Sequence, residues 1–152
     1  MRVSLRPALE SDAEFLFALT KAALGPHVVA TFGPWDETAQ REQFFSTLKL
    51  ALHQVVLLGD ERIGCLNAER REDSLKLNRL FLLPAHQGRG IGERLMRDLM
   101  READIAQLPI RLRVMRVNPA RHFYERLGFF VTGETATHFL MERAFARREP
   151  IS

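Results

Sequence analysis

The sequence contains few residues of several types that often mark a function. Its 152 residues include one cysteine, Cys65, which excludes an intrachain disulfide and a cysteine-based metal cluster. Apolar neighbours in a predicted strand favour Cys65 as a small core residue over a nucleophile. No apolar run approaches the roughly 18 residues that span a membrane, and the segment from Met1 to Glu10 lacks the apolar core of a secretory signal. We therefore expect a cytoplasmic protein without a membrane partner.

Charge of one sign is not concentrated anywhere along the chain. The formal net charge is +3, and the pairs Arg70-Arg71 and Arg147-Arg148 are each followed by acidic residues, as is typical of solvated surface. Few aromatic residues alternate with basic ones on predicted strands, so we expect no nucleic-acid partner. The positive balance equally suits a ligand with several phosphates. Length and composition predict a single globular domain, 1–146, followed by a polar tail, 147–152.

An interrupted alternation of leucines marks the strand before the main motif. Leucines alternate at Leu75 and Leu77 and again at Leu80 and Leu82, so the period-2 pattern slips by one residue. An extra residue near Asn78 and Arg79 explains the slip and predicts a β-bulge. Bulges often lie beside active sites, because they bend a strand from its neighbour and leave backbone N–H and C=O groups free for a ligand.

A glycine-rich turn follows Pro84 and leads into a helix. Glycines alternate over Gly88 to Gly92, and apolar residues recur at helical spacing from Ile91 onward. The turn lets the backbone approach a ligand while the free amides at the helix start face outward, an arrangement that suits a phosphate or pyrophosphate. Arg89 and Arg94 add positive charge. The alternative is that these glycines only make a tight turn; the spacing fits neither a P-loop nor the dinucleotide fingerprint.

Two motifs resemble those of one enzyme family. The run Q-x-x-G-x-G at Gln87 to Gly92, after the strand that ends at Pro84, resembles the acyl-CoA-binding motif of the GNAT superfamily of N-acetyltransferases. The run N-P-A-R-H-F-Y-E-R-L-G-F at Asn118 to Phe129 resembles the family's second landmark, a short helix with a tyrosine before L-G-F. With the order of predicted elements, the resemblance extends over nearly the whole chain.

The resemblance implies a fold, a donor and a reaction. The implied fold is mixed α/β, with a central mixed sheet of about seven strands that splays at a β-bulge and about four helices. The implied function is transfer of an acetyl group from acetyl-CoA to a primary amine, on a small molecule or a peptide, by direct attack in a ternary complex and without a metal. The implied donor-binding residues are Leu80, Phe81, Leu82, Gln87, Gly88, Arg89, Gly90, Ile91, Gly92 and Asn118.

Tyr124, the only tyrosine, stands at the position of the family's general acid and is expected to protonate the leaving thiolate. A phenol, with a pKa of about 10, and a thiol, with a pKa of about 8.5, are close enough for this transfer. The alternative is a packing tyrosine on an amphipathic helix. Glu69, Glu134, His138 and a water chain all stay open as the base that deprotonates the amine.

Other roles are also left open. Trp35, Asp36 and Glu134 are the predicted acceptor-binding residues, although Trp35 also suits a core position between two helices. Asn118 suits a helix N-cap as well as a coenzyme ligand. The alternative to an enzyme is a module that binds acyl-CoA or a phosphate ligand without turnover. The identity of the acceptor amine stays open, and exposed sheet edges are compatible with a homodimer.

The predicted elements before the motif include two helices. The first starts after Ser11-Asp12 and runs through about Leu24, where Gly25-Pro26 is expected to end it. The second runs from Asp36 or Thr38 to His53. A hairpin, a further strand, the motif helix, another strand, a short helix and two strands follow.

Overall fold

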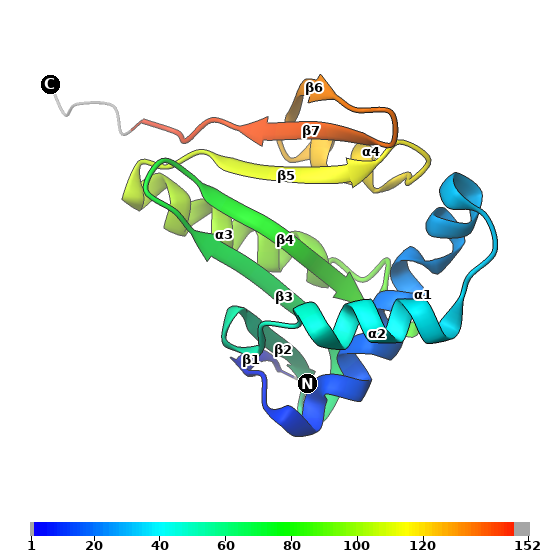
Figure 1. Ribbon diagram of the computed structural model, residues 1–152. Helices are drawn as coiled ribbons and strands as arrows, with labels where there is room; N and C mark the ends of the chain where they lie inside the picture. Colours follow the sequence, from blue (N-terminus) through cyan, green and yellow to red (C-terminus); the bar gives the residue numbers. More distant parts are fainter. Residues whose placement is uncertain (1, 148–152) are drawn as a thin grey trace, which may run out of the picture. The chain divides into compact units, whose positions relative to one another are not determined.

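The computed structural model describes residues 2–147 of the chain. Within this range the chain forms seven β-strands, four α-helices and three short 3-10 helices (Figure 1). In chain order these elements are β1 (Val3–Pro7), η1 (Glu10–Asp12), α1 (Ala13–Phe32), α2 (Glu37–Thr47), η2 (Leu50–Leu52), β2 (His53–Leu58), β3 (Glu61–Arg70), β4 (Leu75–Leu82), η3 (Pro84–His86), α3 (Ile91–Ala106), β5 (Ile110–Met115), α4 (Ala120–Arg126), β6 (Phe130–Glu134) and β7 (His138–Arg143). Of the predicted tail, 147–152, only Arg147 lies within the described residues.

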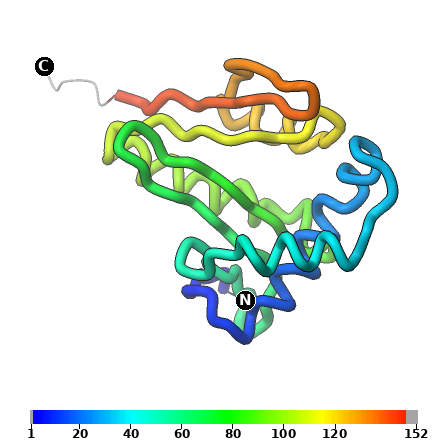
Figure 2. The backbone as a smooth tube through the Cα atoms, viewed as in Figure 1, coloured from blue at the N-terminus to red at the C-terminus, as the bar shows by residue number. Residues whose placement is uncertain are grey.

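The seven strands form one mixed sheet in the order β1-β2-β3-β4-β5-β7-β6. β1 and β2 are far apart in the sequence but lie side by side as antiparallel neighbours (Figure 2). β4 and β5 pair in parallel, and α3 makes the crossover connection that a parallel pair requires. The mixed sheet and the four helices confirm the predicted fold class. The β-bulge near Asn78 stays a prediction.

The described residues group into two compact units. The first unit contains the residues up to Ala68 together with Arg79–Gly92. The second contains Glu69–Asn78 together with the residues from Glu93 onward. The division crosses β4 at the place where the leucine alternation slips, so the two halves of this strand belong to different units.

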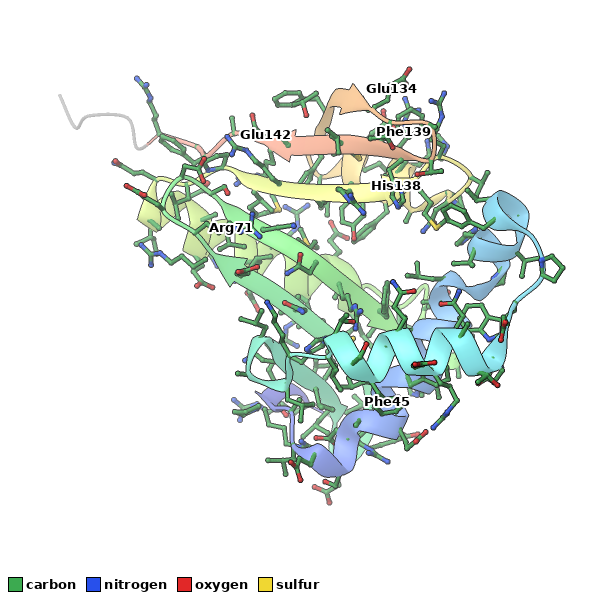
Figure 3. The ribbon with its side chains drawn as sticks, in the orientation of Figure 1. Phe45, Arg71, Glu134, His138, Phe139 and Glu142 are labelled. Carbon is green, nitrogen blue, oxygen red and sulfur yellow. The ribbon has the colours of Figure 1, made fainter. Side chains whose placement is uncertain are left out.

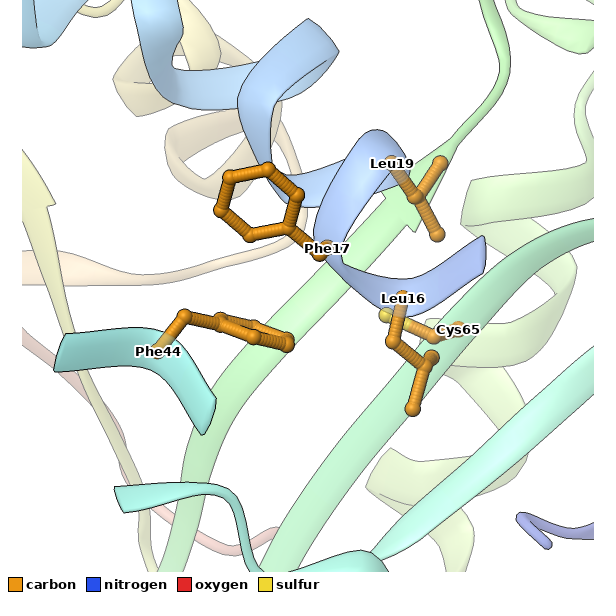
Figure 4. Close-up of a cluster of buried hydrophobic side chains, with 5 residues drawn as sticks. All are labelled: Leu16, Phe17, Leu19, Phe44 and Cys65. Atoms are coloured by element: carbon orange, nitrogen blue, oxygen red, sulfur yellow. The ribbon is translucent and has the colours of Figure 1, made fainter. Parts of the chain in front are cut away.

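In the first unit, α1 and α2 bury an apolar cluster together with β3 (Figure 4). The cluster consists of Leu16, Phe17, Leu19, Phe44 and Cys65. The Phe17 and Phe44 rings meet edge to face, with 5.4 Å between their centroids, a favourable aromatic geometry. Burial raises the pKa of the Cys65 thiol to about 11, so this side chain stays protonated and serves as a core residue, as the sequence predicts.

α1 is longer than the sequence predicts. The predicted stop at Gly25-Pro26 is wrong, because α1 continues past it with Pro26 inside the helix. Gly25 is buried, and a Cβ atom built on it would lie 3.9 Å from the Trp35 ring, so packing at this point overrides the local stop signal. The helix ends instead at Gly33, whose φ of 101° glycine adopts readily and whose N–H donates to the Val29 carbonyl at 3.0 Å.

The second predicted helix is too long at its C-terminal end. α2 ends at Thr47, and His53, its predicted last residue, is the first residue of β2. The physical reason is pairing with β3: His53 is the cross-strand partner of Asn67, and both side chains are buried. Long-range strand pairing of this kind is not visible in a helical spacing of apolar residues.

By length and composition alone, the helical stretch Glu10–Phe32 is long and apolar enough to cross a membrane. The sequence-based expectation that no stretch approaches this length therefore needs qualification. Core helices meet the same criterion, and Leu16 and Leu19 in this stretch are fully buried.

In the second unit, α3 carries a stripe of buried apolar side chains. The buried side chains of this stripe recur at helical spacing: Leu95, Met96, Leu99 and Ala103. β5 alternates between buried and exposed residues, as expected for a strand with one covered face. The Arg143 guanidinium of β7 donates two hydrogen bonds to the Asp104 carboxylate, at 2.9 and 3.2 Å. This bidentate pair links the last turn of α3 to β7.

Gly64 of β3 lies against the backbone of β4. A Cβ atom built on Gly64 would lie 2.3 Å from the Phe81 carbonyl oxygen and 2.7 Å from the Leu82 Cδ2 atom. Gly64→Ala must therefore displace β4, and we expect it to lower the free energy of unfolding by about 1–3 kcal/mol, the range for overpacked sites. Gly133→Ala is the matched control, because its nearest neighbour, Leu140 Cδ1, is at an ordinary 3.5 Å. Chemical denaturation of both variants tests this, and equal losses would contradict the close approach of β3 and β4.

Asp12 is a buried carboxylate at the start of α1. It accepts hydrogen bonds from Arg6 at 2.7 and 3.0 Å, from Arg62 at 3.2 Å and from the Leu9 amide at 2.8 Å. The Arg6 hydrogen bond is the main reason that the pKa of this carboxyl lies well below its usual range. Asp12→Asn leaves two arginines without their charged partner, so we expect a loss of about 2–4 kcal/mol at neutral pH.

The stabilisation from Asp12 depends on pH in a defined direction. Because the folded-state pKa is depressed, the stabilisation is complete above the unfolded pKa of about 4 and is lost as pH falls through the lower folded value. The difference in unfolding free energy between wild type and Asp12→Asn should therefore shrink as pH is lowered. Asp73→Asn is the control, because the Asp73 carboxylate is exposed to water and pairs with Arg111 at 3.2 Å. A loss of unfolding free energy in Asp73→Asn as large as that in Asp12→Asn would contradict a special role for Asp12.

Candidate active site

The donor-binding residues predicted on β4 lie in the first unit. The parallel ladder joins Leu75–Leu77 of β4 to Ile110–Leu112 of β5, and both of these segments belong to the second unit. The following residues of β4, from Arg79 to Leu82, belong to the first unit, where the next amide, that of Leu83, donates to a β3 carbonyl at 2.8 Å. Leu80, Phe81 and Leu82 are all half-buried.

The turn after β4 requires glycine at two positions. Gly88 has a φ of 74° and Gly90 a φ of 77°, values that other residues adopt only with strain. A Cβ atom built on either glycine would have no protein atom within 4 Å, so no other part of the protein packs against the turn at these two positions. Gln87 folds back, and its Nε2 atom donates to the Leu82 carbonyl at 3.0 Å. The positive φ values and the open space are compatible with the predicted phosphate site, which stays a prediction.

The helix start and one arginine add positive potential to this turn. Ile91 begins α3 with a buried side chain, and Gly92 follows in the first turn, where backbone amides have no carbonyl partner within the helix. Arg89 is exposed and makes no ion pair with any residue in the range 2–147. Arg94 of the second unit is also exposed and unpaired over the same range. By contrast, Arg97 of α3 bonds Glu93 at 2.8 Å.

Tyr124 lies in α4 of the second unit. Its ring contacts Phe123 and Phe129 edge to face, at centroid distances of 5.2 and 5.5 Å. Desolvation raises the pKa of the phenol to about 12, so the hydroxyl stays protonated throughout the physiological range. Within the described part of the chain, no group forms a hydrogen bond with this hydroxyl. The rings of Phe123 and Phe129 pack against the phenol, and its role as the general acid stays a prediction.

Asn118 caps the helix that carries Tyr124. Its Oδ1 atom accepts a hydrogen bond from the Ala120 amide at 2.9 Å, and its own amide donates to the Met115 carbonyl at 2.9 Å. The capping alternative considered from the sequence is therefore present in the structure. The role of Asn118 as a coenzyme ligand stays a prediction.

The three candidate bases differ in their surroundings (Figure 3). Figure 3 labels Glu134 of β6 and His138 of β7. The Glu134 carboxylate lies 3.7 Å from the Arg116 guanidinium, and the carboxylate of Glu69, in β3, lies 3.4 Å from the Arg71 guanidinium, so both carboxylates have a cationic neighbour. His138 Nδ1 lies 2.7 Å from the Thr137 hydroxyl. Burial is the main reason that the pKa of His138 is lowered, which favours the neutral, proton-accepting imidazole at pH 7. Which of these groups, if any, serves as the base stays open.

Trp35 and Asp36 have structural partners in the first unit. Trp35 Nε1 donates to the Glu37 carboxylate at 2.9 Å, and the Lys21 ammonium bonds the same carboxylate at 2.6 Å. The Asp36 carboxylate caps α2 by accepting a hydrogen bond from the Ala39 amide at 3.0 Å. These contacts fit the structural alternative for Trp35, while the predicted contact of both residues with an acceptor is not tested.

A polar cluster on three neighbouring strands of the first unit was not predicted from the sequence. His53 of β2, Asn67 of β3 and Arg79 of β4 converge, with Arg79 Nη1 at 3.2 Å and Asn67 Nδ2 at 3.4 Å from His53 Nε2. The available signal was a charged residue within a strand of leucines, which we attributed only to a bulge. Within the range 2–147, no group of three or more His, Cys, Asp or Glu side chains is able to hold a metal ion.

Solved structures resemble this chain over almost its full length. They include PaiA N-acetyltransferase from Thermoplasma acidophilum in complex with coenzyme A (TM-score 0.76, 19% identity, 95% of this chain and 100% of that one). An acetyltransferase from Thermus thermophilus has a TM-score of 0.68 at 23% identity, over 95% of this chain and 97% of that one. N-acetylglutamate synthase from Neisseria gonorrhoeae, complexed with coenzyme A and N-acetyl-glutamate, has a TM-score of 0.67 at 15% identity, over 97% of this chain and 36% of that one. Identities this low show a shared fold.

Family membership comes from the sequence. Comparison with curated protein sequences gives no match. The family model described as "Acetyltransferase (GNAT) domain", however, matches residues 42–131, more than half of the chain, and this segment contains the glycine turn and Tyr124. The chain therefore belongs to the GNAT family of acetyltransferases.

Proposed function

We propose that this acetyltransferase moves an acetyl group from acetyl-CoA to a primary amine by direct attack in a ternary complex, without a covalent enzyme intermediate. The observation that carries the proposal is the turn before α3, where Gly88 and Gly90 take positive φ values beside open space. Acetyl-CoA supplies a thioester whose carbonyl carbon the amine attacks, with the coenzyme A thiol as leaving group. The amides from Gln87 to Gly92, together with Arg89, would hold its diphosphate.

Two further roles complete the proposal. The half-buried backbone at Leu80 to Leu82 would pair with the amide-rich arm of the donor like an added strand, and the N–H of Phe81 or Leu82 would stabilise the developing oxyanion. Tyr124 would donate its O–H to the departing sulfur. Because its pKa of about 12 lies well above the roughly 8.5 of a thiol, the gap is wider than the sequence suggested and transfer of the proton is uphill, so Tyr124 would first stabilise the departing sulfur by a hydrogen bond.

Calorimetry tests the donor site directly. Acetyl-CoA should bind at micromolar concentration, and an acetylated pantetheine arm, which lacks the diphosphate, should bind at least about 10-fold more weakly, since charged hydrogen bonds contribute about 1.5–3 kcal/mol each. Equal affinity for the two would contradict a role for the glycine turn. Absence of any binding at high micromolar concentration would contradict the proposed donor.

The competing function is a module that binds acyl-CoA without turnover. Release of free thiol from acetyl-CoA, measured with a panel of amines, amino acids and peptide N-termini, separates the two. Amine-dependent release supports the enzyme, whereas binding without release by any amine supports the module.

A further inference from the structure

The cluster of His53, Asn67 and Arg79 lies within the first unit, on the same strand as the proposed donor site. His53 and Asn67 are paired across β2 and β3, and their side chains are 4% and 5% exposed. Arg79 is half-buried and lies at the start of the β4 segment that continues to Leu82. The cluster brings together a buried imidazole, a buried amide and a half-buried guanidinium.

The hydrogen bonds fix the state of the histidine. His53 Nδ1 lies 2.8 Å from the Lys49 carbonyl, which only accepts, so Nδ1 carries the proton. His53 Nε2 then accepts from Arg79 and Asn67, at 3.2 and 3.4 Å. Burial first, and then the charge of Arg79, lower the pKa of His53, in agreement with a neutral ring. A neutral histidine orients the guanidinium and leaves its charge uncompensated.

No carboxylate compensates Arg79. Within residues 2–147 its side chain makes one hydrogen bond, to His53, and its guanidinium carbon lies 5.1 Å from the centroid of the Phe44 ring. The N–H groups at Nε and Nη2 have no partner over the same range, and desolvation lowers the pKa of Arg79. A half-buried cation without a counter-ion is less favourable than a paired one, and its N–H donors at Nε and Nη2 are available to an anion from outside the chain.

We infer that Arg79, oriented by His53, binds a carboxylate group of the acceptor, so that the acceptors are amines that also carry a carboxylate, as amino acids do. This inference rests on the proposed function. The planar guanidinium presents paired N–H donors that bind a carboxylate in a bidentate geometry. An uncharged carboxamide on the acceptor would lack the negative charge that pairs with the guanidinium. Three residues of extended strand span about 10 Å, so Arg79 and the thioester site proposed near Leu82 lie within reach of one small molecule. The Phe44 ring gives this site an apolar side.

Paired acceptors test the inference in the wild-type protein. Acetylation of amino acids is compared with acetylation of their carboxamide counterparts, which keep the amine and the shape but lack the anionic charge. We expect kcat/KM to be about 10- to 100-fold higher for the carboxylates, the range for a charged hydrogen-bond pair. Equal rates for acids and amides would overturn the inference while leaving the proposed function intact. Failure to acetylate any amine would instead overturn the proposed function.

Arg79→Gln then identifies the residue responsible. It should remove most of the preference for carboxylates by raising their KM, with the amides and the affinity for acetyl-CoA little changed. Arg41→Gln is the matched control, because Arg41 also lies over phenylalanine rings, at 4.9 Å from Phe17 and 5.2 Å from Phe45, but pairs with Glu14. Loss of acetyl-CoA affinity in Arg79→Gln would show that the anion belongs to the donor and overturn the inference. If Arg79→Gln unfolds, Arg79→Lys is the second variant. It keeps the positive charge but lacks the planar guanidinium, so its preference for carboxylate acceptors over carboxamides should be reduced.

Discussion

Replacing Tyr124 with phenylalanine is expected to lower kcat by about 100-fold or more, the scale of general acid catalysis, with little change in the affinity for acetyl-CoA. The change removes only a hydroxyl, which has no hydrogen-bond partner within residues 2–147, and keeps the ring contacts with Phe123 and Phe129. The expected loss therefore lies in the chemical step. Steady-state kinetics and calorimetry on the same preparation separate the two effects.

Phe123→Leu is the control for Tyr124→Phe. It removes one aromatic neighbour of Tyr124, at 5.2 Å, and keeps the hydroxyl. A packing role for Tyr124 predicts that Phe123→Leu lowers stability and kcat together, while Tyr124→Phe changes neither. An unchanged kcat in Tyr124→Phe would exclude this residue as the acid.

Replacing Gly90 with alanine is expected to weaken acetyl-CoA binding by about 10- to 100-fold. At a φ of 77° an alanine costs about 1–2 kcal/mol in strain, and relief of that strain turns the neighbouring amides away from the position that an anion needs. A Cβ atom on Gly90 would meet no atom of the protein within 4 Å, so the fold itself offers no steric reason for the loss. Isothermal titration with acetyl-CoA measures the change.

Gly33→Ala provides the matched control for Gly90→Ala. Gly33 also has a positive φ, of 101°, and also has nothing within 4 Å of a built Cβ, but it ends α1, away from the glycine turn in the sequence. Both variants should lose stability through backbone strain, and only Gly90→Ala should lose affinity. Equal affinity losses would mean that the effect of Gly90 is general strain and would contradict an anion site in the turn.

The strand, turn and helix around Gly88 to Gly92 could be predicted because local rules specify them. Alternating leucines, glycines at every second position and helical spacing from Ile91 onward each constrain the backbone over a few residues. The structure confirms the strand and the helix, and it adds the positive φ values of Gly88 and Gly90. The binding roles of these residues are not visible in the local rules and stay predictions.

The predictions that failed depend on contacts between distant residues. Gly25-Pro26 has the local chemistry of a helix stop, but packing of the buried glycine beside Trp35 keeps α1 continuous. His53 has the spacing of a helix end, but pairing with Asn67 makes it the first residue of a strand. The cluster around Arg79 could not be predicted for the same reason: its members are 14 and 26 residues from His53 along the chain.

Direct transfer of an acetyl group from acetyl-CoA to an amine is the reaction that we propose for this chain. The most direct measurement mixes the purified protein with acetyl-CoA and a panel of amino acids, and follows both free thiol and acetylated product by mass spectrometry. We predict thiol release that depends on the amine and equals the amount of N-acetyl product, with no acetylated protein accumulating. Acetyl-CoA that binds and stays intact with every amine, or an acetyl group trapped on the protein before the amine is added, would contradict this account.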